Sequence, residues 1–215
     1  MRKILSYIFP FRLNNYSSVI NGDLEINLIN GRKTLDNATC NFSYGSLQQI
    51  LYLGLVDIDF PGNVERVLVL GLGGGSIIET IRDTFKSNVY IELVEIDSEM
   101  ISIATNEFGI NRFDNINIIK GDAIDYLENN QEMFDVIIVD IFVVDTIPES
   151  FTTQKTINSL LSHLTVHGKV IYNTMRQTMS RELFDQIKNN FLMTGLDVKV
   201  LEKVGGSNDL IIANK

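Results

Sequence analysis

Seven short segments rich in apolar residues recur along most of the chain. A short apolar run bounded by glycine or polar residues is typical of a strand that is buried on both faces of a sheet. The pattern predicts strands at residues 67–70, 89–94, 116–119, 134–139, 168–172, 198–203 and 210–213.

Amphipathic helical patterns separate most of these strands. Apolar residues at helical spacing predict helices at about residues 46–55, 76–85, 98–108, 123–129, 153–164 and 180–191. Ser46 and Ser98 are the candidate N-caps of two of these helices. Such alternation predicts an α/β fold, with a doubly wound, mostly parallel sheet and helices on both faces. Only a glycine turn separates the last two strands, so we expect a hairpin with one antiparallel edge strand.

The first 45 residues have a different character. Asn21-Gly22 and Asn30-Gly31 are strong signals for β-hairpin turns. We therefore expect a small antiparallel sheet of three or four strands there. The resulting division is a small β domain over residues 1–45 and a Rossmann-like domain over residues 46–215, bridged by the helix that begins at Ser46.

Composition narrows the classes of function. The formal net charge of -9 argues against a nucleic-acid partner, which requires a basic face. Cys40 is the single cysteine, and His163 and His167 lack zinc-ligand spacing, so we expect neither an intrachain disulfide nor a metal site. The apolar start of the chain is interrupted by Pro10, and no stretch approaches the ~20 apolar residues of a membrane helix. These features predict a cytoplasmic protein without a membrane partner.

The first of these predicted strands is followed by residues that suit ligand binding. Gly71, Gly73, Gly74 and Gly75 follow it, then a helix, then a strand that ends on Glu95. Glycines let a backbone approach a ligand closely, a helix N-terminus offers unpaired N–H groups, and a carboxylate about 20 residues on accepts hydrogen bonds from a ribose. The order therefore predicts a nucleoside site. Ser76 stands where a dinucleotide fingerprint has its third glycine, which favours S-adenosylmethionine over NAD. The alternative is a tight turn in an α/β domain that binds no ligand.

Four blocks of sequence resemble one family. They read VLVLGLGGGSIIETI, IELVEID, INIIKGDAIDYL and FDVIIVDIF, and with their spacing they are similar to the spermidine synthase family of aminopropyltransferases. The resemblance covers roughly residues 15–214. It implies a seven-stranded methyltransferase-like Rossmann domain behind a small N-terminal β domain. It also implies a homodimer, and S-adenosylmethionine or its decarboxylated form as the nucleoside.

The resemblance also assigns roles to single residues. Gly71, Gly73 and Gly75 match the nucleoside-binding turn, Glu95 matches the acid that holds the ribose, Asp122 and Ala123 match the pair beside the adenine, and Asp140 matches the acid that deprotonates the attacking amine. All of them follow predicted strands at the edge where doubly wound sheets bind ligands. Each acid also has a purely structural interpretation: Glu95 as a solvated strand end, Asp122 as a helix cap, and Asp140 as a cap or acceptor.

The sequence departs from the family pattern in two places. Ser76 and Val143 occupy positions where the family has carboxylates that hold the aminopropyl donor and the diamine. Three functions therefore compete: methyl transfer to a small molecule, which the two losses favour; aminopropyl transfer to a diamine, which the overall resemblance favours; and nucleoside binding without turnover. Tyr44, Phe142 and Tyr172 are aromatic residues that line the acceptor pocket or belong to the core.

Overall fold

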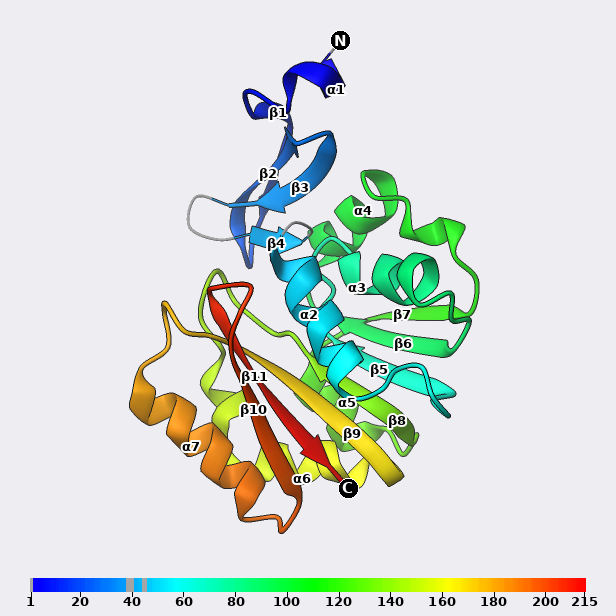
Figure 1. Cartoon of the computed structure of the whole chain (residues 1–215), viewed down its shortest axis with the longest axis vertical. Helices are drawn as coiled ribbons and strands as arrows, with labels where there is room; N and C mark the ends of the chain where they lie inside the picture. The colour runs from blue at the N-terminus through cyan, green and yellow to red at the C-terminus, as the bar shows by residue number, and fades with distance from the viewer. Residues whose placement is uncertain (1, 38–40, 44–45) are drawn as a thin grey trace.

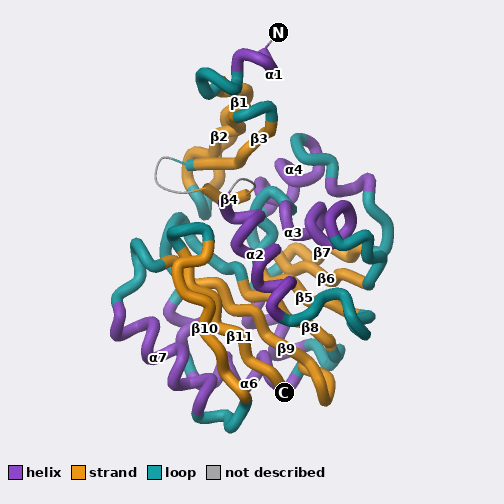
Figure 2. Tube along the Cα trace, viewed as in Figure 1, coloured by secondary structure: helices purple, strands orange, loops and turns teal. Residues whose placement is uncertain are grey.

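The computed structural model describes residues 2–37, 41–43 and 46–215. For residues 41–43, 46 and 47 it describes the backbone and not the side chains. Cys40 and Tyr44, and the side chain of Ser46 as a helix cap, thus lie outside the description. The described chain forms two sheets, a four-stranded one near the N-terminus and a seven-stranded one that carries most of the helices (Figures 1 and 2).

The N-terminal sheet is antiparallel, with strand order β1-β2-β3-β4. Its elements, preceded by the short helix α1 (Arg2–Leu5), are β1 (Phe11–Ser18), β2 (Gly22–Ile29), β3 (Arg32–Asp36) and β4 (Asn41–Ser43). The two hairpin turns lie where Asn-Gly predicts them, because Gly22, Asn30 and Gly31 all adopt the positive φ that such turns need. The sheet packs its apolar face against α4 through a small shared core.

The large sheet has the strand order β10-β11-β9-β8-β5-β6-β7. Its strands are β5 (Arg66–Leu70), β6 (Tyr90–Glu95), β7 (Ile116–Lys120), β8 (Phe134–Val139), β9 (Leu164–Met175), β10 (Asp197–Val204) and β11 (Asn208–Asn214). Strands β5 to β9 pair in parallel, and β11 is antiparallel to both of its neighbours. The seven-stranded, mostly parallel sheet is thus confirmed.

The place of the antiparallel strand corrects the sequence prediction. The last strand lies inside the sheet, between β9 and β10, and not at its edge. Residues 208–213 of β11 are all buried, whereas β10 has several exposed side chains. The more apolar strand of the hairpin therefore takes the interior position, where both of its faces are covered.

Helices cover both faces of this sheet. One core contains side chains of α2, α3, the π-helical turn η1 and α4, and the other contains side chains of α5, α6 and α7. The bounds are α2 (Ser46–Asp57), α3 (Ser76–Glu79), η1 (Thr80–Thr84), α4 (Ser98–Asn106), α5 (Ala123–Asn129), α6 (Gln154–Ser162) and α7 (Arg181–Leu192), with 3₁₀ turns η2 (Ile110–Arg112) and η3 (Glu149–Thr152). Alternate residues of each strand pack into the two cores, since side chains of a strand alternate between faces.

Local details refine the predicted elements. Asp97 and not Ser98 caps α4, because its carboxylate accepts the hydrogen bond from the Glu99 N–H. Strand β9 extends beyond the predicted residues 168–172 at both ends. His163 is buried, and its ring nitrogens lie 2.8 and 3.0 Å from backbone carbonyls, which is a structural role. In the described part of the chain no helix is long and apolar enough to cross a membrane.

Candidate nucleoside-binding and transfer site

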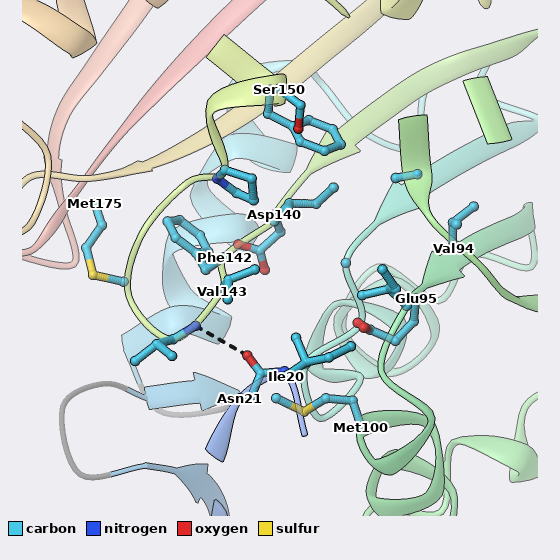
Figure 3. A pocket seen from close by; sticks show the side chains of 18 of the residues that line it. Ile20, Asn21, Val94, Glu95, Met100, Asp140, Phe142, Val143, Ser150 and Met175 are labelled. Carbon is cyan, nitrogen blue, oxygen red and sulfur yellow. Dashed lines mark hydrogen bonds between the residues drawn. The ribbon is translucent and has the colours of Figure 1, made fainter. Parts of the chain in front are cut away.

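A pocket of about 280 Å³ opens at the carboxyl ends of β5, β6 and β8, where doubly wound sheets bind their ligands (Figure 3). It brings together six of the seven residues predicted from the sequence, which are Gly71, Gly73, Glu95, Asp122, Ala123 and Asp140. The seventh, Gly75, is not among the described residues that line it.

The glycine turn has three positive φ angles. Gly71 has φ +94°, and a Cβ atom there would lie 2.2 Å from the carbonyl oxygen of Asp140. Glycine is therefore required where β5 and β8 approach each other. Gly73 also has a positive φ, and it exposes backbone to the pocket. Gly75 has φ +82° and packs closely on Ile110, so its contribution is to the fold of the turn.

Glu95 is a buried carboxylate in the wall of the pocket. Its Oε2 accepts a hydrogen bond from the Leu72 N–H at 2.9 Å, and its Oε1 accepts one from the Asp97 N–H at 2.8 Å. Burial raises the pKa of Glu95, and these backbone hydrogen bonds oppose that rise. The carboxylate is thus held rigidly, and each oxygen retains a lone pair that can accept from a hydroxyl group.

Asp97 fastens the N-terminal sheet to this wall. Its Oδ2 accepts hydrogen bonds from Ser18 Oγ at 2.5 Å and from Asn21 Nδ2 at 2.8 Å. Asn21 also accepts a hydrogen bond from the backbone N–H of Val144 at 3.3 Å, and both residues line the pocket (Figure 3). The turn between β1 and β2 is therefore part of the pocket, a role that the hairpin signal alone did not reveal.

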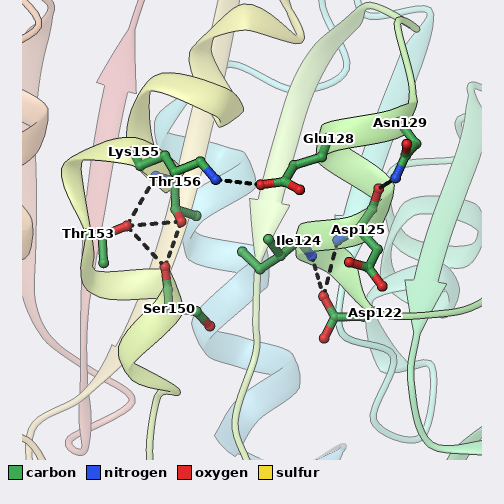
Figure 4. Close-up of polar contacts among 9 residues, drawn as sticks. All are labelled: Asp122, Ile124, Asp125, Glu128, Asn129, Ser150, Thr153, Lys155 and Thr156. Carbon is green, nitrogen blue, oxygen red and sulfur yellow. Dashed lines mark hydrogen bonds and ion pairs between the residues drawn. The ribbon is translucent and has the colours of Figure 1, made fainter.

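Asp122 is the N-cap of α5. Its Oδ1 accepts the backbone N–H groups of Ile124 at 2.7 Å and Asp125 at 3.2 Å (Figure 4). The structural interpretation of Asp122 is thus correct. Because Asp122 also lines the pocket with Ala123, its place beside an adenine stays a prediction.

Asp140 lies directly after β8, facing the glycine turn. Asn173 Nδ2 donates a hydrogen bond to its Oδ1 at 2.8 Å. Burial of the carboxyl group raises the pKa of Asp140 to about 6, although the hydrogen bond from Asn173 lowers it. A carboxylic acid that titrates near neutrality in a cleft is suited to proton transfer.

Sequence reasoning missed the amides behind Asp140. Asn173 lies near the end of β9, and Asn208 begins β11; both side chains are buried. Asn208 and Ser207 also line the pocket. The available signal was the placement of amides at the ends of otherwise apolar strands, since buried polar groups need partners.

The pocket combines acids with an apolar wall. Glu95, Asp122 and Asp140 are its carboxylates, and no Lys, Arg or His is found among the described residues that line it. Apolar side chains from several segments make the rest of the wall, among them Ile20, Ile50, Met100, Ile141 and Phe142. Such a lining suits a flat nucleoside whose reactive end carries positive charge.

The two departures from the family pattern have different positions. Val143 lines the pocket and is 40% exposed, and its apolar side chain supplies no carboxylate there. Ser76 is buried at the start of α3, outside the described lining. Among the aromatic residues, Phe142 lines the pocket. Tyr172 is fully buried and its hydroxyl group donates to the Phe151 carbonyl, so of its two interpretations the core residue is correct.

The fold and the site define a class: Rossmann-like transferases with the methyltransferase arrangement of strands. The model of the methyltransferase domain family matches residues 63–210, and the chain belongs to that family.

Named relatives come from two branches. The polyamine aminopropyltransferase of Vibrio vulnificus is 27% identical over 143 residues, which are 63% of this chain and 48% of that protein. The human eEF1A lysine and N-terminal methyltransferase is 32% identical over 119 residues, which are 50% of this chain and 17% of that protein. The chain thus spans about half of the first relative and far less of the second.

The fold extends the likeness over nearly the whole chain. The crystal structure of spermidine synthase from Thermotoga maritima superposes with a TM-score of 0.73 at 19% identity, covering 95% of this chain and 72% of that one. The resemblance to the spermidine synthase branch is thereby confirmed at the level of fold.

Proposed function

We propose that this chain is an S-adenosylmethionine-dependent transferase of the spermidine-synthase-like branch, and that it transfers a methyl group to a small molecule. One observation carries the proposal. The pocket holds Asp140 beside a glycine turn and a rigid ribose-type carboxylate, while an apolar side chain, Val143, replaces the family's second acid.

The residues of the pocket fit the nucleoside in this proposal. Glu95 would accept hydrogen bonds from the ribose hydroxyls, because its oxygens face the pocket and are fixed by two backbone N–H groups. The backbone at Gly71 and Gly73 would lie close to the donor, and Asp122 with Ala123 would flank the adenine. The negative lining favours a sulfonium cation, since no basic side chain among the described lining residues opposes it.

Asp140 would act as the general base. With a pKa of about 6 the group is mostly ionised at neutral pH, and it would accept a proton from an amine or hydroxyl nucleophile. Bound S-adenosylmethionine supplies a carbon that its own sulfonium activates. The protein's main contribution is then to hold the acceptor in line with that carbon and to exclude water.

Aminopropyl transfer is the second candidate. It is supported by the likeness to the Vibrio vulnificus aminopropyltransferase. Against it stand Val143 and Ser76, which remove two carboxylates that would hold cationic amines in a desolvated site. A protein acceptor is a variant of methyl transfer, suggested by the name of the human relative. Nucleoside binding without turnover is the remaining alternative.

Thermal unfolding with three nucleosides tests the proposal. S-adenosylmethionine, its decarboxylated form and methylthioadenosine are compared in parallel, with an E95Q variant as the control for site-specific binding. A ligand at ~100 times its dissociation constant adds about 2.7 kcal/mol to stability. We expect S-adenosylmethionine to give the largest shift.

The other results separate the alternatives. A preference for the decarboxylated donor would favour aminopropyl transfer, and diamines would then be tested as acceptors. The absence of a shift with all three nucleosides would contradict both transferase candidates. Binding followed by no turnover with any acceptor in a methyl-acceptor screen of amines, alcohols and purified proteins would favour the binding module.

A further inference from the structure

A series of side-chain hydrogen bonds runs from the β10–β11 turn to Asp140. Ser207 Oγ donates to Asn208 Oδ1 at 2.6 Å, and Asn208 Nδ2 donates to Asn173 Oδ1 at 2.9 Å. Asn173 Nδ2 then donates to Asp140 Oδ1 at 2.8 Å. Ser207 lies in the β10–β11 turn and Asn208 begins β11, whereas Asn173 lies near the end of β9 and Asp140 follows β8.

The direction of these hydrogen bonds follows from which groups can donate and which can accept. An ionised Asp140 can only accept, so Asn173 must present its amino group to it. The oxygen of the Asn173 amide then points to Asn208, which must donate. Asn208 in turn presents its own oxygen to Ser207, whose hydroxyl group donates. Reversing either amide would place two oxygens against each other in a buried site, where an unmade hydrogen bond costs most.

The far end of this chain is rigidly held. The backbone N–H of Arg176 donates to the Ser207 carbonyl at 3.0 Å. The Arg176 guanidinium also contacts both oxygens of the buried Asp209 carboxylate, at 2.8 and 2.9 Å. The turn that precedes Asn208 is therefore anchored to Arg176, the residue that follows β9. Asn173 and Asn208 are only 1% and 3% exposed, so water does not substitute for either amide.

We propose that Asn208 is a positioning residue for Asp140, acting through Asn173. Asn208 fixes which end of the Asn173 amide faces Asp140 Oδ1, and this leaves Oδ2 of Asp140 as the oxygen that meets the acceptor. The inference rests on the proposed function only for the role of Asp140 as a base. The hydrogen-bond geometry stands without it.

The proposal makes Asn208 act at a distance on a measurable property. Without Asn208, the Asn173 amide loses its fixed orientation and donates less to Asp140, so the Asp140 carboxylate is less stabilised. Simple opening of the pocket to water would have the opposite effect, because hydration favours the ionised form. Among the described residues, Glu95 and Asp122 share the pocket with Asp140, and Asp209 and Glu202 are paired with Arg176.

The test is a carboxyl titration by ¹³C NMR on the ligand-free protein. Aspartate is labelled at the carboxyl carbon, and the Asp140 resonance is assigned by its loss in D140N. The pKa of Asp140 is then measured in wild type, N173A, N208A and the double variant. We expect N173A to raise the pKa by about one unit, N208A to raise it by a smaller amount, and the double variant to match N173A.

Each departure from this pattern has a meaning. An unchanged or lowered pKa in N208A would overturn the proposal, and so would a shift in N208A that adds in full to that of N173A. Q177A is the matched control, because Gln177 lines the same pocket from an exposed position, and its pKa effect should be negligible. Should N208A fail to fold, S207A removes the preceding donor, and a raised Asp140 pKa is expected again; an unchanged pKa would then count against the proposal.

The titration is independent of the proposed function. It needs neither donor nor acceptor. The expected pKa pattern in the four proteins, together with no nucleoside binding, would reject the transferase and retain the positioning role of Asn208. Nucleoside binding without that pKa pattern would retain the transferase and reject the positioning role.

Discussion

The carboxylate of Glu95 accepts the backbone N–H of Leu72 at 2.9 Å, and this bond joins the end of β6 to the glycine turn after β5. The same carboxylate holds the N–H of Asp97. One side chain therefore shapes the turn and presents oxygens to the pocket. The residue predicted to hold a ribose is also the residue that organises the site around it.

Replacing Glu95 with glutamine should damage both properties. The amide can accept from one backbone N–H but would present its own N–H₂ to the other, and an unsatisfied buried donor costs about 1–3 kcal/mol. We expect E95Q to lower the free energy of unfolding in urea by that amount and to weaken S-adenosylmethionine binding at least about tenfold. E182Q, at an exposed position of α7, is the control; equal binding by E95Q and wild type would remove Glu95 from the nucleoside site.

Gly71 should tolerate no side chain. In G71A the new Cβ would meet the Asp140 carbonyl oxygen at 2.2 Å, and the backbone would keep a φ of +94° that alanine disfavours. We expect a loss of roughly 3 kcal/mol or more in chemical denaturation. G121A is the matched control in the same pocket, because nothing lies within 4 Å of its added Cβ. Similar stabilities of the two variants would contradict the close packing of β5 on β8.

The raised pKa of Asp140 should appear as a dependence of stability on pH. The folded protein holds this proton up to about pH 6, whereas the unfolded chain releases it near 3.8. The contribution of the protonated Asp140 to folding stability is therefore fully present below about pH 3.8 and is lost as the pH rises through about 6. Relative to wild type, D140N should gain roughly 2–3 kcal/mol between pH 4 and pH 8.

Urea unfolding at several pH values measures that gain. D23N, which removes an exposed aspartate of β2, should run parallel to wild type. Parallel curves of unfolding free energy against pH for D140N and wild type would show that Asp140 has an ordinary pKa. As a separate outcome, D140N should lose turnover while it retains nucleoside binding.

Asn21 should couple the N-terminal sheet to the pocket. N21A removes the donor to Asp97 at 2.8 Å and the acceptor for the Val144 N–H at 3.3 Å. We expect a loss of about 1–2 kcal/mol in stability, faster hydrogen exchange at Val144, and weaker nucleoside binding. N63A, at an exposed site, is the control. Unchanged exchange at Val144 would show that the β1–β2 hairpin does not hold the loop that contains Val144.

The division into domains at residues 1–45 and 46–215 stays a prediction.

Val143 should determine the preference for donors and acceptors. V143D returns a carboxylate to the position where the family has its second acid, at a partly exposed point of the pocket wall. We expect binding of a diamine, measured by calorimetry, to strengthen by about three- to tenfold, as for a partly solvated ion pair. V166D, on an exposed residue outside this pocket, is the control. No gain in V143D would show that loss of this acid does not explain the proposed specificity.

Much of the site was predictable because of one geometric rule. Gly71, Glu95, Asp122 and Asp140 each follow a strand that the apolar pattern reveals, and the carboxyl ends of parallel strands meet at one edge. Their convergence needed no knowledge of long-range contacts. The amide of Asn173 was not predictable in the same way, because its partner Asn208 is 35 residues away.

The sequence by itself determined the class of fold, the alternation of strands and helices, and the six predicted residues that line the pocket, because periodicity and strand ends are local properties of the chain. Only the tertiary structure decided that β11 lies inside the sheet, that Asn21 and Asp97 meet across 76 positions, and that burial raises the pKa of Asp140 to about 6. These outcomes depend on which groups are buried together, and burial is a property of the packed molecule.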